Sequence, residues 1–153
     1  RQENVDSREA LTSLLTALGA LPYPVVLPLH PRTAKRVEEF GLKDLLCSGA
    51  IQVREPVSYL EMLVLLSRAQ LVLTDSGGLQ KEAFFLRIPC VTLRNETEWV
   101  ETVELGWNQV VGTQRERILQ AVAGARAGRP GAPYGDGEAA RKIAQSLLRR
   151  EEF

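Results

Sequence analysis

The segment Thr74–Glu82 (TDSGGLQKE) places a hydroxyl, two adjacent glycines and a carboxylate directly after an apolar run. An apolar run followed by a tight turn predicts that a strand ends here and a helix begins. The first amides of a helix have no internal partners and carry partial positive charge, so this helix start could bind phosphate. Gly77 and Gly78 would let the backbone approach a diphosphate closely, and Ser76 could add a hydroxyl donor.

Glu82 lies four residues after Gly78, which puts it one turn along the same helix face. A carboxylate can accept hydrogen bonds from both hydroxyls of a ribose, so amides followed by a carboxylate suit a nucleoside diphosphate. The segment is neither a Walker loop nor a GxGxxG motif. The same residues also make a good turn and helix cap in any fold, which leaves a purely structural role open.

The composition is that of an ordinary folded protein, with 153 residues, 44% hydrophobic and 25% charged. One domain covering residues 1–153 is therefore expected. Nineteen acidic and nineteen basic side chains give no net charge, which argues against a mainly electrostatic nucleic-acid binder but leaves a small basic patch open. No stretch approaches the roughly 18 consecutive apolar residues that span a bilayer, so no membrane partner is expected.

The two cysteines, Cys47 and Cys90, belong to no CxxC or Cys/His cluster, so no metal site is expected. Cys90 lies in an apolar run and is predicted to be a buried, inert side chain. Free thiols without an export signal indicate a reducing compartment, and hence a cytoplasmic protein. The chain opens Arg1-Gln2-Glu3, without methionine, which indicates a processed chain or a piece of a longer one.

Helical and strand patterns alternate along the chain. We expect helices at 5–18, from 31 to about 40, after Pro56, and at 79–86, 98–103, 114–127 and 138–150, and strands at 25–29, 51–53, 71–73, 88–93 and 110–111. The glycine- and proline-rich segment 128–137 is expected to be a flexible connector, and Arg149–Glu152 a solvated helix end. This alternation predicts an α/β fold, with a doubly wound, Rossmann-like parallel sheet.

Ligands of such sheets bind beyond the carboxyl ends of the strands. The loops expected there are His30-Pro31, Arg54–Val57, Thr74–Gly78 and Arg94–Trp99. Two of their residues have alternative interpretations. His30 is most simply a helix-entry residue, and Arg94 could neutralise phosphate or pair with Glu96 or Glu98. Trp107 is expected in the core.

The segment Thr74–Ala83 closely resembles the signature of the non-hydrolysing UDP-N-acetylglucosamine 2-epimerases. Other family segments are matched in order and spacing: the end of His-Arg-x-Glu-Asn by Arg1–Asn4, a histidine after a strand by His30-Pro31, Pro-x-x-Tyr-x by Pro56–Leu60, and Pro-Val-x-x-x-Arg with Thr-Glu by Pro89–Arg94 with Thr97-Glu98. The resemblance covers nearly the whole chain and is weakest after Gly112.

The resemblance implies the carboxyl-terminal half of a two-domain enzyme with the GT-B fold, whose active site lies between two Rossmann-like halves. In the family this half holds UDP. The implied contacts are Ser76, Gly77 and Gly78 to the diphosphate, Glu82 to the ribose, and the loop Pro56–Met62 to the uracil, with Val57 offering main-chain groups and Met62 packing on the base. Arg1, His30 and Arg94 are the remaining substrate-binding positions that it implies.

The family reaction interconverts UDP-GlcNAc and UDP-ManNAc through loss of UDP, a 2-acetamidoglucal intermediate and re-addition with inversion at C2. The C2 proton needs acid/base groups, and the departing UDP needs fixed donors. The family's acidic catalytic groups lie in the amino-terminal half, and its histidine would precede Arg1. The resemblance therefore implies no catalytic residue here, no activity of this segment alone and no metal or other cofactor. Its implied partners are UDP, UDP-N-acetylhexosamine, the amino-terminal half and, at full length, a second copy in a homodimer.

Two positions depart from the family pattern. Trp99 stands where some members have an arginine that contributes to the nucleotide site, and Met62 replaces an aromatic residue found in some members. A GT-B glycosyltransferase half, which also has a glycine-rich turn and a ribose-binding glutamate, is an alternative. The segment Arg1–Asn4 favours the epimerase. A non-catalytic nucleotide-sugar sensor is the third possibility.

Overall fold

The computed structural model describes residues 1–148, and within them every strand pairing is parallel. The strands are Val25–Pro28 (β1), Ile51–Arg54 (β2), Val72–Thr74 (β3), Cys90–Thr92 (β4) and Asn108–Val110 (β5). They form a two-stranded sheet, β1-β2, and a three-stranded sheet in the order β3-β4-β5. The α/β class and the parallel strands expected from the sequence are confirmed.

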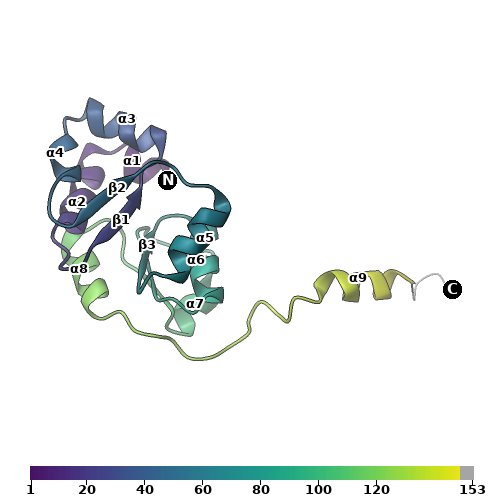
Figure 1. Cartoon of the computed structure of the whole chain (residues 1–153). Coiled ribbons are helices and arrows are strands. Elements are labelled where there is room, and N and C mark those ends of the chain that lie inside the picture. Colours follow the sequence, from purple (N-terminus) through teal and green to yellow (C-terminus); the bar gives the residue numbers. More distant parts are fainter. Residues whose placement is uncertain (149–153) are drawn as a thin grey trace.

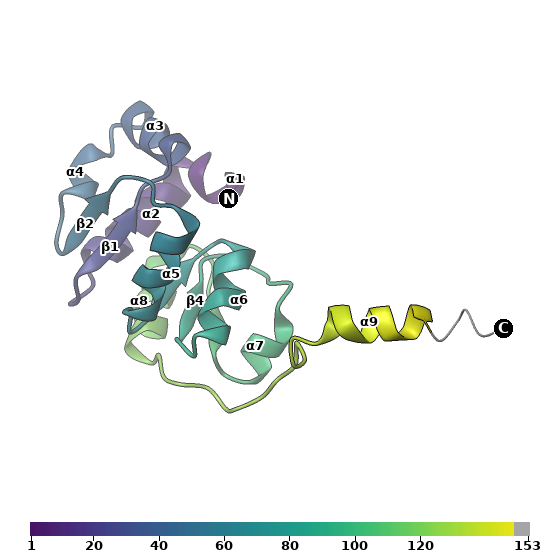
Figure 2. The same ribbon diagram turned by 45° about the vertical axis from the view of Figure 1, so that its right-hand side comes forward.

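Helices alternate with these strands, as Figures 1 and 2 show. They are Gln2–Val5 (α1), Arg8–Gly19 (α2), Pro31–Glu39 (α3), Lys43–Leu46 (α4), Tyr59–Ser67 (α5), Gly77–Phe85 (α6), Val100–Glu104 (α7), Arg115–Ala123 (α8) and Ala139–Leu148 (α9). No helix within residues 1–148 has the length and apolar character that crossing a membrane requires.

Neighbouring residues of the strands face opposite helical layers, because side chains alternate across a sheet. Val91 packs with α2 and α8, whereas Val72 and Cys90 pack with α5 and α6. Helices thus cover both faces of the three-stranded sheet. Cys90 is buried, as expected, and burial raises the pKa of its thiol to about 12.

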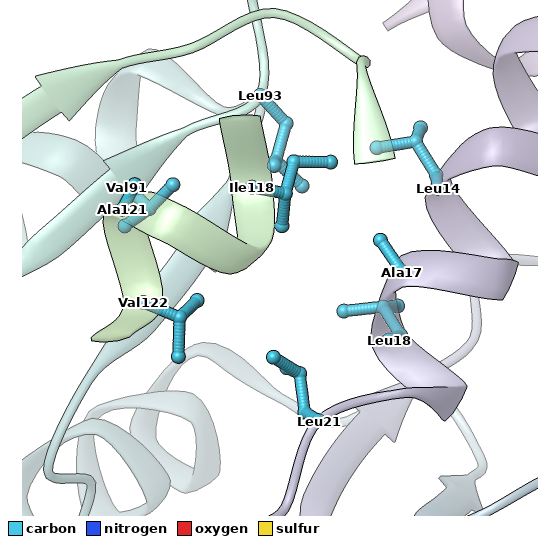
Figure 3. Close-up of a cluster of buried hydrophobic side chains, with 9 residues drawn as sticks. All are labelled: Leu14, Ala17, Leu18, Leu21, Val91, Leu93, Ile118, Ala121 and Val122. Atoms are coloured by element: carbon cyan, nitrogen blue, oxygen red, sulfur yellow. The ribbon is translucent and has the colours of Figure 1, made fainter. Parts of the chain in front are cut away.

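The largest apolar cluster joins α2, β4 and α8 (Figure 3). Its members are Leu14, Ala17, Leu18, Leu21, Val91, Leu93, Ile118, Ala121 and Val122. Partly buried residues of β1, β2 and β3 pack against the same cluster, including Leu27, Ile51 and Leu73. The two sheets therefore share one core although they do not share a hydrogen-bonded ladder.

The separation of the two ladders has a cause in β1. The amides of Val25 and Leu29 donate to the β2 side, so the alternating amides of Val26 and residue 28 face the other edge. Residue 28 is Pro28, which has no N–H to donate. The edge of β1 directed away from β2 therefore offers too few donors for a continuous ladder to β3.

The first expected helix, 5–18, is divided in the structure. Ser7 is extended and its side chain accepts a hydrogen bond from the Ala10 amide, so it ends one helical segment and caps the next. The helix then continues through Gly19, one residue beyond the expected end. The short helix α4 was not expected, because four residues give too little periodicity to identify a helix.

The segment 128–137 was expected to be flexible, but its first part is fixed against the body of the domain. The Arg129 amide donates to the Leu105 carbonyl at 2.7 Å, and the buried Trp107 indole donates to the Arg129 carbonyl at 2.8 Å. Tyr134 packs edge-on against Phe84. The prediction of a free connector is wrong for this part, because aromatic side chains distant in sequence hold it.

The helix expected at 138–150 is present as α9, with no buried residue, and it extends away from the rest of the described chain (Figures 1 and 2). The end of that expected helix and the charged segment Arg149–Glu152 lie outside the described residues.

Truncating Ile118 tests whether the shared core holds the two sheets together. Ile118 is 1% exposed, so Ile118→Ala should lower the free energy of unfolding by about 3 kcal/mol through lost burial and a residual cavity. The matched control is Ile143→Ala on α9, where the side chain is 61% exposed and the change should stay within about 0.5 kcal/mol. Urea titrations of the two variants measure the difference, and equal losses would contradict this description of the core.

Candidate functional site

The site begins where β3 ends and α6 starts. Ser76 is the N-cap, and its Oγ accepts a hydrogen bond from the Leu79 amide at 3.5 Å. Its carbonyl accepts from the Gln80 amide at 3.2 Å. Within residues 1–148, no group accepts a hydrogen bond from the amides of Gly77 and Gly78. The helix starts two residues before the expected position, and it presents the free donors that an anion site needs.

The two glycines have different surroundings. Gly78 is exposed, and a Cβ there would meet only Ser76 Oγ, at 3.7 Å. At buried Gly77 a Cβ would lie 2.2 Å from Glu98 Oε1. The Trp99 indole Nε1 also donates to the Gly77 carbonyl at 2.8 Å. A side chain at position 77 would therefore displace the Glu98 carboxylate, whereas Gly78 has open space beside the helix start.

Arg94 pairs with Glu98, one of the two partners that the sequence left open. Its Nη1 lies 2.8 Å from Glu98 Oε2, and its Nε lies 4.0 Å from Glu3 Oε1. The Arg94 side chain is 11% exposed, and its buried Nε has no hydrogen-bond acceptor within residues 1–148. Bonds to Glu98 from its own backbone amide and then from Arg94 hold the pKa of Glu98 below its ordinary value. A carboxylate and a guanidinium thus stand together at the start of α6.

Glu82 occupies the next turn of α6 and is half-buried. Its Oε2 is inaccessible to solvent and has no hydrogen-bond donor among residues 1–148. Buried polar atoms are normally hydrogen-bonded, because an unsatisfied one keeps the cost of its lost hydration. The carboxylate that the sequence assigned to a ribose therefore has an unpaired oxygen, which a ligand would reach once the side chain turns outward.

Asn4 and Asp75 also contribute to the site, and neither was identified as a site residue from the sequence. Asn4 is 4% exposed, and its amide donates to the Leu93 carbonyl at 2.8 Å and to Asp75 Oδ2 at 3.1 Å. The main-chain nitrogen of Arg1 lies 2.6 Å from Asp75 Oδ2, and its guanidinium lies 3.7 Å from Glu98 Oε1. The segment Arg1–Asn4 is thereby joined to the ends of β3 and β4. Its resemblance to a family motif was the available signal, but it did not identify Asp75.

Trp99 and Tyr134 enclose the ammonium group of Lys81. The Lys81 Nζ lies 4.3 Å from the centre of the Trp99 ring and 4.6 Å from that of Tyr134. The Tyr134 hydroxyl contacts Glu101 Oε2 at 3.2 Å, and burial, followed by Glu101, raises the pKa of Tyr134 to about 12. A cation is thus present beside Trp99, but it comes from α6, and no local pattern in the sequence indicated the contact.

The structure does not show the other predicted residues in contact with the α6 start. His30 is exposed and its Nδ1 accepts from the Arg32 amide at 3.2 Å, which is the helix-entry role. Val57 is half-buried just before Ser58, which begins α5 with a capping box. The expected loop to Met62 therefore ends at Ser58. Met62 lies on α5 and packs against the apolar cluster of α5, β3 and α6.

The described part of the chain, residues 1–148, contains no group of three or more His, Cys, Asp or Glu side chains placed to hold a metal ion. Two free amides, a hydroxyl, a guanidinium and a carboxylate with an unused oxygen can bind a phosphate-containing ligand that also carries hydroxyl groups.

Comparisons with known proteins identify the relatives of this chain. A family model described as UDP-N-acetylglucosamine 2-epimerase matches residues 1–148. A UDP-2,3-diacetamido-2,3-dideoxy-D-glucuronate 2-epimerase from Pseudomonas aeruginosa is 48% identical over 97% of this chain and 42% of its own length. The UDP-GlcNAc 2-epimerase of Methanocaldococcus jannaschii, solved in complex with UDP-GlcNAc and UDP, matches with a TM-score of 0.83 and 39% identity over 97% of this chain and 43% of its own.

A third match is the UDP-GlcNAc 2-epimerase from Neisseria meningitidis bound to UDP-GlcNAc, with a TM-score of 0.81 and 30% identity over 97% of this chain and 43% of that one. The chain thus spans about two-fifths of the length of these relatives. Because the family model covers almost all of it, the chain belongs to the UDP-N-acetylglucosamine 2-epimerase family.

Proposed function

We propose that this chain is the UDP-binding part of a UDP-N-acetylglucosamine 2-epimerase, which interconverts UDP-GlcNAc and UDP-ManNAc by elimination and re-addition of UDP. The observation that carries the proposal is the pairing of free Gly77 and Gly78 amides with the unused Glu82 oxygen one turn later. A diphosphate needs the donors and a ribose needs the acceptor. The structure of the relative from Methanocaldococcus jannaschii in complex with UDP-GlcNAc and UDP supports the assignment.

In this proposal the start of α6 binds the diphosphate, with Ser76 adding its hydroxyl and Arg94 its charge. These groups are fixed before the ligand arrives, so they would stabilise the negative charge that develops on UDP as the bond to the sugar breaks. Glu82 would hold the ribose and repel a further phosphate at that position. This segment would supply the leaving-group site, and the remaining chemistry would come from elsewhere in the full-length enzyme.

The proposal also includes contacts that the helix start alone does not supply. Arg1 would approach the substrate beside Asp75, and His30, Val57 and Met62 would contribute from the neighbouring strand ends and α5. Their support is the family resemblance. We further propose an amino-terminal half, which supplies the catalytic groups, a homodimer at full length and a cytoplasmic location, with no metal or other cofactor.

A second candidate differs in the sugar. The relative from Pseudomonas aeruginosa is named as the 2-epimerase of UDP-2,3-diacetamido-2,3-dideoxy-D-glucuronate. Both UDP-sugars contain UDP, so the start of α6 would bind either substrate. Product analysis of the full-length protein with each UDP-sugar distinguishes the two candidates. It also tests the glycosyltransferase and sensor alternatives, because these predict sugar transfer to an acceptor or no turnover.

Titration calorimetry with UDP tests the proposed site. Wild-type protein should bind UDP, and Glu82→Ala should weaken binding at least about tenfold, because a hydrogen bond to a charged group is lost. Pyrophosphate binding should change much less, since it has no ribose. The matched control, Glu116→Ala at an exposed position of α8, should leave UDP binding unchanged. Equal losses for UDP and pyrophosphate in Glu82→Ala would refute the ribose role.

The carboxylate of Glu98 provides a test of the opposite sign. Its Oε1 lies beside Gly77, so it repels an incoming diphosphate and occupies Arg94. Glu98→Gln should therefore tighten UDP binding by about two- to fivefold, as expected for removing one charge near a helix terminus. The control is Glu96→Gln on the same exposed loop. Weaker binding by Glu98→Gln alone would mean that Glu98 is a ligand group and not a competitor.

A further inference from the structure

A cluster of hydrogen-bonded polar side chains, all buried except the half-buried Thr97, adjoins the start of α6. Its members come from α6, β4, β5, α7 and the loop after β4: Gln80, Thr92, Thr97, Thr102 and Asn108. Gln80 is 0% exposed, although it follows Gly77 by only three residues. A buried amide at that point needs an explanation, because an apolar side chain would avoid the cost of burying polar atoms.

The amide of Gln80 connects the loop to the sheet. Its Oε1 accepts from Thr97 Oγ1 at 2.6 Å and from Asn108 Nδ2 at 3.1 Å. Asn108 is held in turn, because its Oδ1 accepts from Thr92 Oγ1 at 2.7 Å. Two buried side chains, Asn108 and Thr92, therefore fix where the Gln80 oxygen lies, and with it the position of the half-buried Thr97.

The bonds continue from Thr97 to the start of α6. Thr97 Oγ1 accepts from the Trp99 amide at 3.1 Å, and the Trp99 indole donates to the Gly77 carbonyl at 2.8 Å. Glu98, between these two residues, carries the carboxylate that pairs with Arg94. The loop that bears Arg94 and Glu98 is thus hydrogen-bonded to α6, the helix that bears the free amides. Gln80 is the buried α6 side chain that bonds to this loop, through Thr97.

We propose that Gln80 is a positioning residue that aligns Arg94 and the loop 97–99 with the Gly77 and Gly78 amides for binding of a nucleoside diphosphate. This inference rests on the proposed function and deepens it. Gln80 acts through Thr97 and does not touch the ligand. Its effect is confined to the phosphate end of the site, because Glu82 is placed by α6 itself.

The first test compares UDP with UMP in calorimetry, using Gln80→Met, which keeps the length of the side chain and removes its amide. UDP binding should weaken about tenfold and UMP binding less than twofold, because UMP lacks the second phosphate. A merely structural role would weaken both ligands equally. The matched control is Gln109→Met, a change of the same type on β5, where the residue is exposed and makes one 3.5 Å bond to the Ala121 carbonyl.

A second pair of variants keeps Gln80 and changes its partner. Thr97→Val removes the hydroxyl and should weaken UDP binding as Gln80→Met does. Thr97→Ser keeps the hydroxyl and should bind UDP as the wild type does. The double variant Gln80→Met/Thr97→Val should be no weaker than either single one, because both remove the same contact. If Gln80→Met fails to fold, the two Thr97 variants still test whether the bond between Gln80 and Thr97 affects UDP binding.

A measurement without ligand separates this inference from the proposed function. The chain has two indole N–H groups, on Trp99 and Trp107, which bond to different carbonyls. Gln80→Met should speed hydrogen exchange of the Trp99 indole at least about tenfold and leave Trp107 unchanged. Unchanged exchange at Trp99, or equal loss of UDP and UMP, would overturn the role of Gln80. If Gln80→Met shows the exchange difference but the wild type binds no UDP, the proposed function is refuted, and with it the nucleotide role of Gln80.

Discussion

The proposed binding site depends on two backbone amides, those of Gly77 and Gly78 at the start of α6. Neither amide has an acceptor within the described chain. Unpaired donors at a helix start attract anions, and the rest of the site is arranged around them. β3 delivers the chain to this point, and β4 carries Arg94 and Glu98 to its side. The proposed binding of UDP follows from this one feature.

Much of this feature could be predicted from sequence because it is local. A strand, a Ser-Gly-Gly turn and a helix lie within the fourteen residues 72–85, and their propensities agree. Glu82 was placed correctly on the next turn by helical spacing alone. The alternation of helices and strands predicted that helices cover both faces of the sheet. It did not predict the gap between the β1-β2 and β3-β4-β5 ladders, although Pro28, which lacks the N–H for such a ladder, is visible in the sequence.

The remaining features depend on contacts between distant residues. Nothing near Gly77 in the sequence indicates that Glu98 would lie beside it, or that Trp99 would bond to its carbonyl. The contact between Tyr134 and Lys81 could not be predicted for the same reason. A glycine- and proline-rich segment is typical of a flexible connector, and here contacts with distant aromatic side chains fix it. The buried role of Gln80 also depends on Thr97 and Asn108, which a helical pattern cannot reveal.

The central claim is tested most directly by recording amide nuclear magnetic resonance spectra of the ¹⁵N-labelled chain during a titration with UDP. The account predicts that the Gly77 and Gly78 amide signals move furthest and downfield, because each N–H gains a charged acceptor, with smaller changes at Arg94. Saturable changes that leave both glycines in place and gather elsewhere, for instance in the apolar groove lined by Leu29 and Val53, would contradict it.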